Sequence, residues 1–311
     1  MKKINLFLAV IFFLLCQTNV YGSTIKFAQI SDLHYQSNVL RKNVNYYSLP
    51  IIDSVAEQIN EDKDVKFTLI TGDIINKRKY DDAEFIYKHF NEIFNKPWYS
   101  VFGNHDLGGK FIFKFRLLNL LAEINEFFSN NKKDYYFFKP ESDIIFIGLN
   151  SNYAFKRTPV GYLSKRQLKF LNNVFSQAKQ SDVIVIFMHH TPIEFPLIHK
   201  NHYIYNEEEF MTLLKSKSNP ILLLGGHYHA CKIEREGNLV KVATPSLTTL
   251  PLGFRFIEID NTRTRTIFNF EYKEVNFSLQ EYIFKYLKIK QMPARECREY
   301  DRNISILIEK I

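Results

Sequence analysis

The sequence predicts one large α/β domain. Short runs rich in β-branched and aromatic residues alternate with longer amphipathic stretches, the pattern of strands alternating with helices. Hydrophobic residues make up 46% of the 311 residues and charged residues 24%, so the chain can bury a core and lacks the composition of a disordered protein. A chain of this length also favours one domain over two.

Ten strands are expected from short apolar runs. They cover Ile25–Ile30, Phe67–Ile70, Trp98–Phe102, Tyr135–Phe138, Ile144–Leu149, Val183–Met188, Ile221–Leu224, Val240–Ala243, Phe254–Ile259 and Thr264–Tyr272. Helical spacing of apolar residues predicts five helices between them, at Leu49–Asn60, Asp81–Phe94, Phe115–Phe128, Ser164–Lys179 and Glu207–Ser216. A last helix should begin at Ser278, because Ser278 and Glu281 have the spacing of a capping box.

The first 22 residues have the pattern of a signal peptide. Two lysines precede an apolar run from Leu6 to Cys16, and Gly22 with Val20 fits a cleavage site before Ser23. The apolar run is too short to span a bilayer, so an uncleaved anchor is the weaker alternative. We therefore expect a secreted or periplasmic protein with no stable membrane span after cleavage.

The remaining chain divides into a main domain and an extension. We place the main domain at residues 23–275 and a helical C-terminal extension at 276–311.

A lipid anchor on Cys16 is disfavoured, because Leu15 stands where lipoprotein signals carry a small residue. Two cysteines remain after cleavage, Cys231 and Cys297, and an oxidising compartment would allow them to pair.

The chain is basic, with a formal charge of +8 that falls to +6 without the two lysines of the leader. Such a balance suits anionic partners, among them phosphate esters, anionic lipid surfaces and nucleic acid. The basic residues are scattered, however, and an ordinary solvated surface explains them as well. We predict no nucleic-acid partner, and the sequence leaves the oligomeric state open.

Side chains capable of binding metal directly follow five of the predicted strands. The five blocks are Asp32-Leu33-His34, Thr71-Gly72-Asp73, Gly103-Asn104-His105-Asp106, His189-His190 and Gly225-Gly226-His227-Tyr228-His229. Ligands of an open α/β sheet bind beyond the carboxyl ends of its strands, so these blocks can converge on one site. Each block alone has an ordinary explanation as a turn or a structural histidine. All five together, each at a strand end, indicate a site.

The types of side chain in the blocks indicate the kind of metal. Imidazole, carboxylate and amide ligands suit manganese, iron or zinc better than calcium or a thiolate-bound structural zinc. Asp32 and His34 are two residues apart and would point the same way on an extended chain, as would His227 and His229. Seven ligands exceed the need of one ion. We therefore expect two divalent transition-metal ions that share a bridging carboxylate.

These blocks resemble those of the calcineurin-like metallophosphoesterase family, over about Ile25 to Ile259. The resemblance implies a four-layer α/β/β/α sandwich, with two mixed sheets flanked by helices. It also implies one metal bound by Asp32, His34 and His229, a second bound by Asn104, His189 and His227, and Asp73 as the bridge. His189 is preferred to His190 because it directly follows the predicted strand.

Two further segments resemble the branch of the family that includes class III cyclic-nucleotide phosphodiesterases. They are Gly161-Tyr162-Leu163-Ser164 and His189-His190-Thr191-Pro192. The chain departs from the pattern in two places. Ile74-Ile75-Asn76 lacks the further acidic residue that many relatives carry, and Asp106 stands where others have Glu. Neither departure removes a ligand.

The expected activity is hydrolysis of a small-molecule phosphate ester by a metal-bridged hydroxide, with a phosphodiesterase as the first hypothesis. His105 is placed to donate a proton to the leaving oxygen, and Asp106 to orient it; a purely structural role for His105 is the alternative. A phosphomonoesterase, a lipid-headgroup hydrolase and a non-catalytic binding protein on the same fold are the other hypotheses. The complete ligand set disfavours the last of these.

Specificity should come from the loops between the blocks. Aromatic and basic residues there could stack a base or bind phosphate, although aromatics at helical spacing more often belong to the core. Candidates in the Gly108–Asp134 insertion are Phe111, Phe113, Lys114 and Arg116, and a second loop carries Asn150, Tyr153 and Arg157. The blocks themselves contain no lysine or arginine, which favours a singly charged diester over a doubly charged monoester. The nearest cations in the sequence are Lys77, Arg78, Lys110, Lys114 and Arg116.

Overall fold

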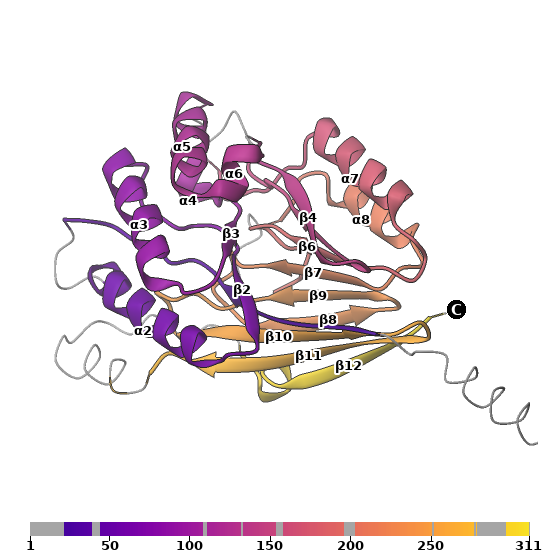
Figure 1. The fold of residues 1–311 in the computed structure, drawn as a ribbon. Coiled ribbons are helices and arrows are strands. Elements are labelled where there is room, and N and C mark those ends of the chain that lie inside the picture. The colour runs from indigo at the N-terminus through magenta and orange to yellow at the C-terminus, as the bar shows by residue number, and fades with distance from the viewer. Residues whose placement is uncertain are drawn as a thin grey trace, which may run out of the picture.

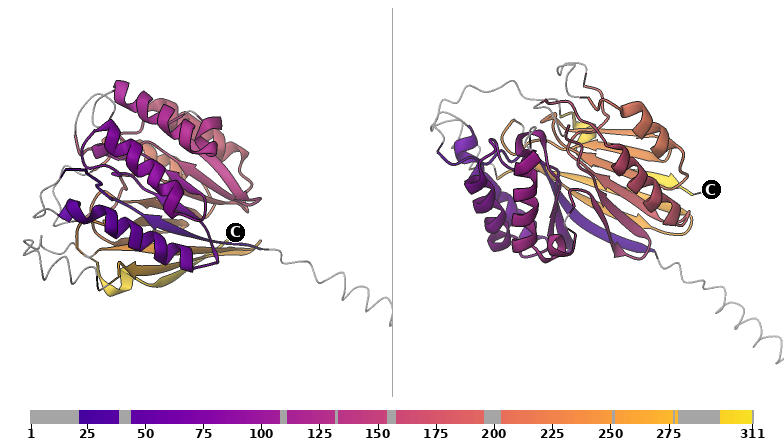
Figure 2. Two further views of the ribbon diagram at one scale, coloured as in Figure 1. Left: turned by 60° about the vertical axis from the view of Figure 1, so that its left-hand side comes forward. Right: turned by 90° about the horizontal axis from the view of Figure 1, so that it is seen from above.

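Two six-stranded mixed sheets lie face to face and carry helices on their outer faces (Figure 1, Figure 2). This computed structural model describes residues 22–38, 44–107, 111–131, 133–153, 158–195, 203–250, 252–276, 278 and 297–310. The layers confirm the predicted α/β/β/α sandwich. Residues 1–21 of the predicted signal peptide, and residues 279–296 of the predicted last helix, lie outside the described residues.

The first sheet combines the N-terminal strands with the end of the chain. Its order is β12 (Ile304–Glu309), β11 (Arg265–Glu274), β10 (Gly253–Asn261), β1 (Ser23–Ile30), β2 (Val65–Ile70) and β3 (Trp98–Ser100). β1, β2 and β3 run parallel, whereas β1 pairs antiparallel with β10, which continues through β11 to β12. The carboxyl ends of three parallel strands therefore meet at one edge of this sheet.

The second sheet is also a mixed sheet of six strands. Its order is β4 (Tyr136–Glu141), β5 (Ile144–Gly148), β6 (Val183–Phe187), β7 (Ile221–Gly225), β9 (Leu239–Ala243) and β8 (Lys232–Glu236). The four inner strands are parallel, and β4 and β8 pair antiparallel at the two sides. β8 was not predicted, because its sequence Lys-Ile-Glu-Arg-Glu has the charged, half-exposed character of an edge strand rather than an apolar run.

Helices cover the outer face of each sheet. α2 (Ser48–Glu61), α3 (Tyr80–Ile93) and α5 (Phe111–Ile124) pack beside the first sheet, and α7 (Lys165–Gln177) and α8 (Glu207–Lys215) beside the second, as Figure 2 shows from above. Shorter helical segments are η1 (Val44–Tyr47), α4 (Asn104–Leu107), α6 (Glu126–Asn130) and η2 (Glu299–Asp301).

The single helix predicted at Phe115–Phe128 is divided in two at Asn125. The Asn125 backbone is extended, and its side-chain oxygen accepts a hydrogen bond from the amide of Phe127 at 3.0 Å. This is an N-cap, which begins a new helix, so the apolar periodicity continues through a break in the backbone. The prediction missed the break because it weighed spacing and not capping.

An aromatic core joins the two sheets. Phe27 of β1 and Phe67 of β2 stack at 5.5 Å between ring centroids, and both contact the ring of Phe146 in β5 edge-on, at 5.2 and 5.1 Å. Nearer the carboxyl ends, Gln29 is fully buried and donates to the Gly225 carbonyl at 3.2 Å. Its side-chain oxygen accepts from Thr244 Oγ1 at 2.8 Å. These contacts fix the strand ends of one sheet against those of the other.

The end of the chain is a strand, so the prediction of a helical extension over 276–311 is wrong for residues 304–309. Ile306 and Ile308 are buried while their neighbours are exposed, and this alternation of period two is the pattern of an edge strand. The segment is held by a disulfide between Cys231 and Cys297, whose Cα atoms lie 4.6 Å apart. The buried guanidinium of Arg255 donates to the carbonyls of Asp301 and Arg302.

None of the helices in the described parts of the chain has the length and apolar character needed to cross a membrane.

Reduction of the Cys231–Cys297 disulfide should destabilise the fold. The two cysteines are 66 residues apart, and the chain-entropy relation for a loop of that size gives a contribution of about 4 kcal/mol to the free energy of unfolding. We expect the Cys231→Ser and Cys297→Ser double variant to unfold at a lower urea concentration than the oxidised wild type. Reduced wild type is the matched control, and coincident unfolding curves for its oxidised and reduced forms would contradict this role.

Candidate metal centre

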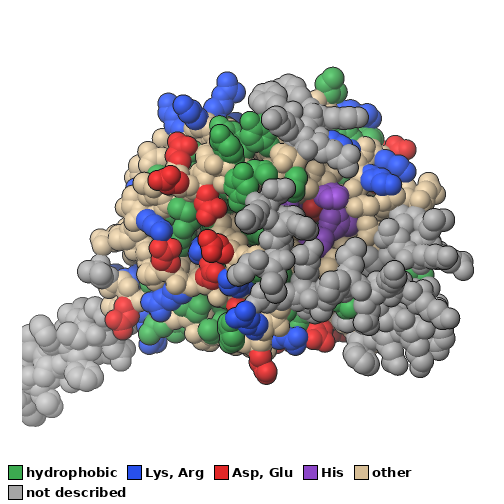
Figure 3. All heavy atoms as spheres, turned by 180° about the vertical axis from the view of Figure 1, so that it is seen from behind, with side chains coloured by type: hydrophobic (Ala, Val, Ile, Leu, Met, Phe, Trp, Pro, Cys, Tyr) green, Lys and Arg blue, Asp and Glu red, His purple; other side chains and the backbone are tan. Residues whose placement is uncertain are grey.

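The five blocks lie in loops at the carboxyl ends of five parallel strands. β1, β2 and β3 contribute three loops from the first sheet, and β6 and β7 contribute two from the second. Five of the seven predicted ligands are buried, whereas Asn104 and His229, like the predicted proton donor His105, are partly exposed. Figure 3 shows histidine side chains reaching the surface at one place on the face seen from behind. The convergence of the blocks is therefore a feature of the fold.

Five of the predicted ligands have left-handed backbone conformations. Their φ angles are +53° at Asp32, +46° at His34, +50° at Asp73, +71° at His227 and +54° at His229, and among the described non-glycine residues only Asn38 shares this conformation. The expectation of an extended backbone at Asp32 and His34, and at His227 and His229, is therefore wrong. Each such residue costs of the order of 1–3 kcal/mol, and strain of this kind gathers at functional sites.

Backbone contacts hold these turns in place. The amide of Asp32 donates to the Gly72 carbonyl at 3.1 Å, and that of His34 donates to the Asp73 carbonyl at 2.9 Å. Gly226 is needed because a Cβ there would collide with the Ser31 hydroxyl and the Asp32 carboxylate. The strained residues are thus fixed by neighbouring loops before any ligand binds.

Asp32, His34 and His229 form the first group of ligand atoms. His229 Nε2 lies 3.1 Å from His34 Nε2 and 3.2 Å from Asp32 Oδ1, and the last two atoms are 3.9 Å apart. The second carboxylate oxygen of Asp32 accepts from the Ser31 hydroxyl at 2.7 Å and from the His227 amide at 2.9 Å. The Thr249 hydroxyl contacts Nδ1 of His229 at 2.7 Å. These outer contacts direct the remaining ligand atoms at one another.

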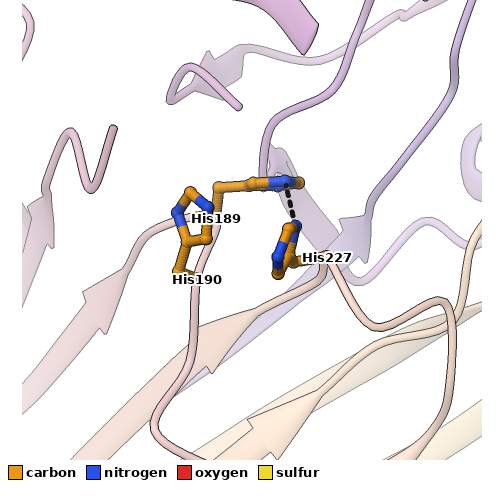
Figure 4. A group of neighbouring side chains, drawn as sticks. All are labelled: His189, His190 and His227. Carbon is orange, nitrogen blue, oxygen red and sulfur yellow. Dashed lines mark hydrogen bonds between the residues drawn. The ribbon is translucent and has the colours of Figure 1, made fainter. Parts of the chain in front are cut away.

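Asn104, His189 and His227 form the second group. His189 Nε2 lies 3.1 Å from Asn104 Oδ1 and 3.1 Å from His227 Nδ1, the contact drawn in Figure 4. His189 Nδ1 donates to the Thr71 carbonyl at 2.9 Å, so Nε2 is the nitrogen that would bind a metal.

Asp73 stands between the two groups. Its Oδ2 lies 3.3 Å from His189 Nε2 and 3.8 Å from His34 Nε2, so one oxygen faces a histidine of each group. Its Oδ1 accepts from the backbone amide of His105 at 2.8 Å. This is the position that a bridging carboxylate requires.

The donor set fits divalent transition metals. Bonds of about 2.1 Å at tetrahedral angles place ligand atoms roughly 3.4 Å apart. The separations of 3.1, 3.2 and 3.9 Å in the first group bracket that value, and the two separations of 3.1 Å in the second group lie just below it. Burial lowers the pKa of His34 to about 3, which keeps its ring neutral and able to ligate. Burial alone would raise the pKa of Asp32, but His229 and His189 lower it to about 2, which keeps the carboxylate ionised. Nitrogen and oxygen ligands in these protonation states suit manganese, iron or zinc.

His105 is oriented by a backbone carbonyl. Its Nδ1 donates to the Asn76 carbonyl at 2.8 Å, and its ring meets the ring of His34 edge-on at 4.7 Å between centroids. The other ring nitrogen, Nε2, is therefore the one left to act on a substrate.

The prediction that Asp106 orients His105 is wrong. The Asp106 carboxylate is buried and accepts from the amides of Ile74 at 2.9 Å, Ile75 at 3.0 Å and Gly103 at 2.7 Å. Both oxygens are thereby engaged with backbone, and the residue ties the loop after β2 to the loop after β3. It supports the site and does not touch the reacting groups.

His190 contacts Ser151, and none of the ion pairs of Asp73 in the described residues involves it. Its ring is buried, its Nδ1 lies 2.8 Å from the Ser151 hydroxyl, and its centroid lies 4.3 Å from that of His227. Figure 4 shows His189 and His190 with their rings on different sides of the loop after β6. The geometry therefore agrees with His189, not His190, as the residue facing the bridge.

The predicted specificity residues that the structure describes have partners in other parts of the fold. Phe113 is part of the core, Lys114 pairs with Asp134 at 3.0 Å, and the Arg116 guanidinium stacks over Tyr80 at 4.1 Å. Asn150 donates to Asp134 at 2.6 Å, and Tyr153 packs against Tyr162 at 5.3 Å. Lys110 and Arg157, and the side chain of Phe111, lie outside the described residues.

A cavity of about 540 Å³ opens beside His105. The described residues that line it are Asn76, Lys77, Arg78, Asn104, His105, Thr158 and Pro159. Lys77 and Arg78 were expected only as flanking cations, although just three residues separate Lys77 from the second block, which placed both near the site. The cavity has the size of a small-molecule site.

Comparison with known proteins agrees with this geometry. A family model described as Calcineurin-like phosphoesterase matches residues 25–231, more than half of the chain. A relative from Colwellia psychrerythraea, named "Probable cyclic nucleotide phosphodiesterase", is 24% identical over 210 residues, which cover 66% of this chain and 71% of that protein.

Solved structures share the fold. A dimetal phosphatase from Danio rerio has a TM-score of 0.59 at 16% identity, covering 81% of this chain and 99% of that one. A purple acid phosphatase from yellow lupin has a TM-score of 0.53 at 10% identity, covering 94% and 55%. The match of the family model over five converging blocks leads to one conclusion: the chain belongs to the calcineurin-like phosphoesterase family and is a hydrolase of phosphoric esters.

Proposed function

We propose that the protein is a secreted, two-metal phosphodiesterase. The observation that carries the two-metal part is the position of Asp73 Oδ2 between His189 and His34, which joins two groups of ligand atoms. Asp32, His34 and His229 would hold one ion and Asn104, His189 and His227 the other. The similarity to the relative named as a phosphodiesterase supports the choice of substrate class.

The chemistry divides between the ions and the side chains. When bound, two divalent ions such as manganese, iron or zinc would lower the pKa of water and neutralise charge on the phosphoryl oxygens. His105 would act as the acid in its imidazolium form, in which Nδ1–H donates to the Asn76 carbonyl and the second proton, on Nε2, is the one available for transfer. Donation of that proton to the leaving oxygen assists departure of the alcohol. Asp106 keeps the two loops that carry Asp73 and His105 in register.

Removal of the bridge should empty both metal positions. We expect wild-type protein to contain close to two transition-metal ions per chain. Asp73→Ala should lose both ions, because the same Asp73 oxygen, Oδ2, faces a histidine of each group. Elemental analysis measures this directly. Asp64→Ala is the matched control, since Asp64 is exposed at the opposite end of β2. Full activity with at most one ion would remove the two-metal mechanism.

Removal of His105 should separate proton donation from metal binding. His105→Ala should keep its metal content and lose roughly 10²–10⁴-fold in kcat, the usual contribution of a positioned proton donor. His89→Ala is the control, because His89 lies on α3 and contacts Asp53 at 2.6 Å, away from the five loops. A loss of metal in His105→Ala would instead identify His105 as a ligand.

Diesters should be hydrolysed better than monoesters. The seven predicted ligands include no lysine or arginine, so the second negative charge of a monoester has no cationic side chain among them to pair with. The measurement is kcat/KM for a nitrophenyl phosphodiester and for nitrophenyl phosphate at the same metal loading and pH. A preference of about tenfold or more for the monoester would make the enzyme a phosphomonoesterase on the same metal site.

Export should remove the leader. The short apolar run after two lysines supports cleavage, and the Cys231–Cys297 disulfide suits an oxidising compartment. We expect a secreting host to release protein that begins at or near Ser23, which mass spectrometry of the intact chain would detect. Recovery of the chain from membranes with residues 1–22 attached would overturn the secreted assignment.

A further inference from the structure

Two cations line the cavity beside His105, and their chain is anchored there. The Asn76 amide donates to the Tyr35 carbonyl at 2.9 Å, and the Asn76 carbonyl accepts from His105. Lys77 and Arg78 follow at once and line the cavity. Their backbone therefore starts from a fixed point next to His105.

The described lining of the cavity carries positive charge and no carboxylate. Lys77 and Arg78 are two of its seven described lining residues, and none of the seven is acidic. Among the described lining residues, the positive charge therefore comes from the loop after β2.

The cavity lies beside the metal ligands and not among them. Of the seven predicted ligands only Asn104 lines it, together with the proton donor His105. A phosphoryl group held by both groups of ligand atoms would thus have its leaving oxygen near His105 and the rest of the leaving group in the cavity. Lys77 and Arg78 would meet that leaving group and not the phosphoryl group.

We propose that Lys77 and Arg78 form a subsite for an anionic group on the leaving alcohol. The preferred substrate is then a phosphodiester whose leaving group bears a second negative charge. Arginine can bind such a group with two parallel hydrogen bonds, and lysine adds a flexible charge. This inference rests on the proposed function, because His105 defines the leaving-group side.

Binding tests the subsite without turnover. The probes are two non-hydrolysable phosphonates, methyl (3-carboxybenzyl)phosphonate and its neutral 3-carbamoyl analogue, which differ by one charge. Calorimetry on metal-loaded wild type should show the carboxylate bound about threefold to tenfold more tightly, and less so at high salt. In the Lys77→Gln, Arg78→Gln double variant the two affinities should become equal.

A matched variant controls for net charge. Arg263→Gln with Arg265→Gln also removes two positive charges, from exposed residues at the β10–β11 turn. That turn adjoins Asn261, which pairs with Ser23 at the end of β1 opposite to the metal ligands. This control should keep the wild-type preference for the carboxylate. Loss of preference in both double variants would reduce the effect to overall charge and overturn the subsite.

Turnover of the corresponding methyl 3-carboxyphenyl and 3-carbamoylphenyl phosphates separates the two proposals. If neither ester is hydrolysed while the binding preference holds, the phosphodiesterase assignment fails and the subsite stands. If both are hydrolysed and wild type binds the two phosphonates equally, the subsite fails and the enzyme assignment stands. Equal preference in wild type and in the Lys77→Gln, Arg78→Gln variant would also overturn the subsite.

Discussion

The alignment of two sheets with their parallel strand ends at a common edge is the constraint on which the site depends. Phe27, Phe67 and Phe146 fill the space between the sheets, and Gln29 joins β1 to β7 just below the loops. Each sheet alone carries only part of the ligand set. Because packed interiors resist sliding, the two parts are held at ligand distances without direct covalent connection between the loops that carry them.

Rigidity of the centre comes from hydrogen bonds that do not involve the ligand atoms themselves. Asp32, Asp73 and His189 each use one side-chain atom to contact backbone or a hydroxyl, and present the other to the centre. The left-handed turns that aim Asp32 and His227 are unfavourable by themselves, and the contacts around them offset that cost. Such preorganisation lowers the reorganisation required when ions bind.

The strand positions and the blocks that follow them could be predicted because apolar runs and polar strand ends are local signals. The fold layers came from the family resemblance. β8 was missed because a charged edge strand has no apolar run, and β12 because its alternation lies in a segment expected to be helical. The predicted role of Asp106 was wrong because its carboxylate binds the amides of Ile74 and Gly103, and a pattern of side chains does not reveal contacts with backbone groups. The cavity beside His105 likewise depends on loops far apart in the sequence.

The place of β1 in the first sheet has a consequence for the order of folding. β1 pairs with β2 on one side and with β10 on the other, so Ser23 lies opposite Asn261. The N-terminal strand therefore stays half-paired until most of the chain has been synthesised, and contacts of such long separation form slowly. Asp32 and His229 meet only when both sheets are in place. A complete set of metal ligands is thus a late product of folding, and ions that bind it stabilise the finished fold and not its early intermediates.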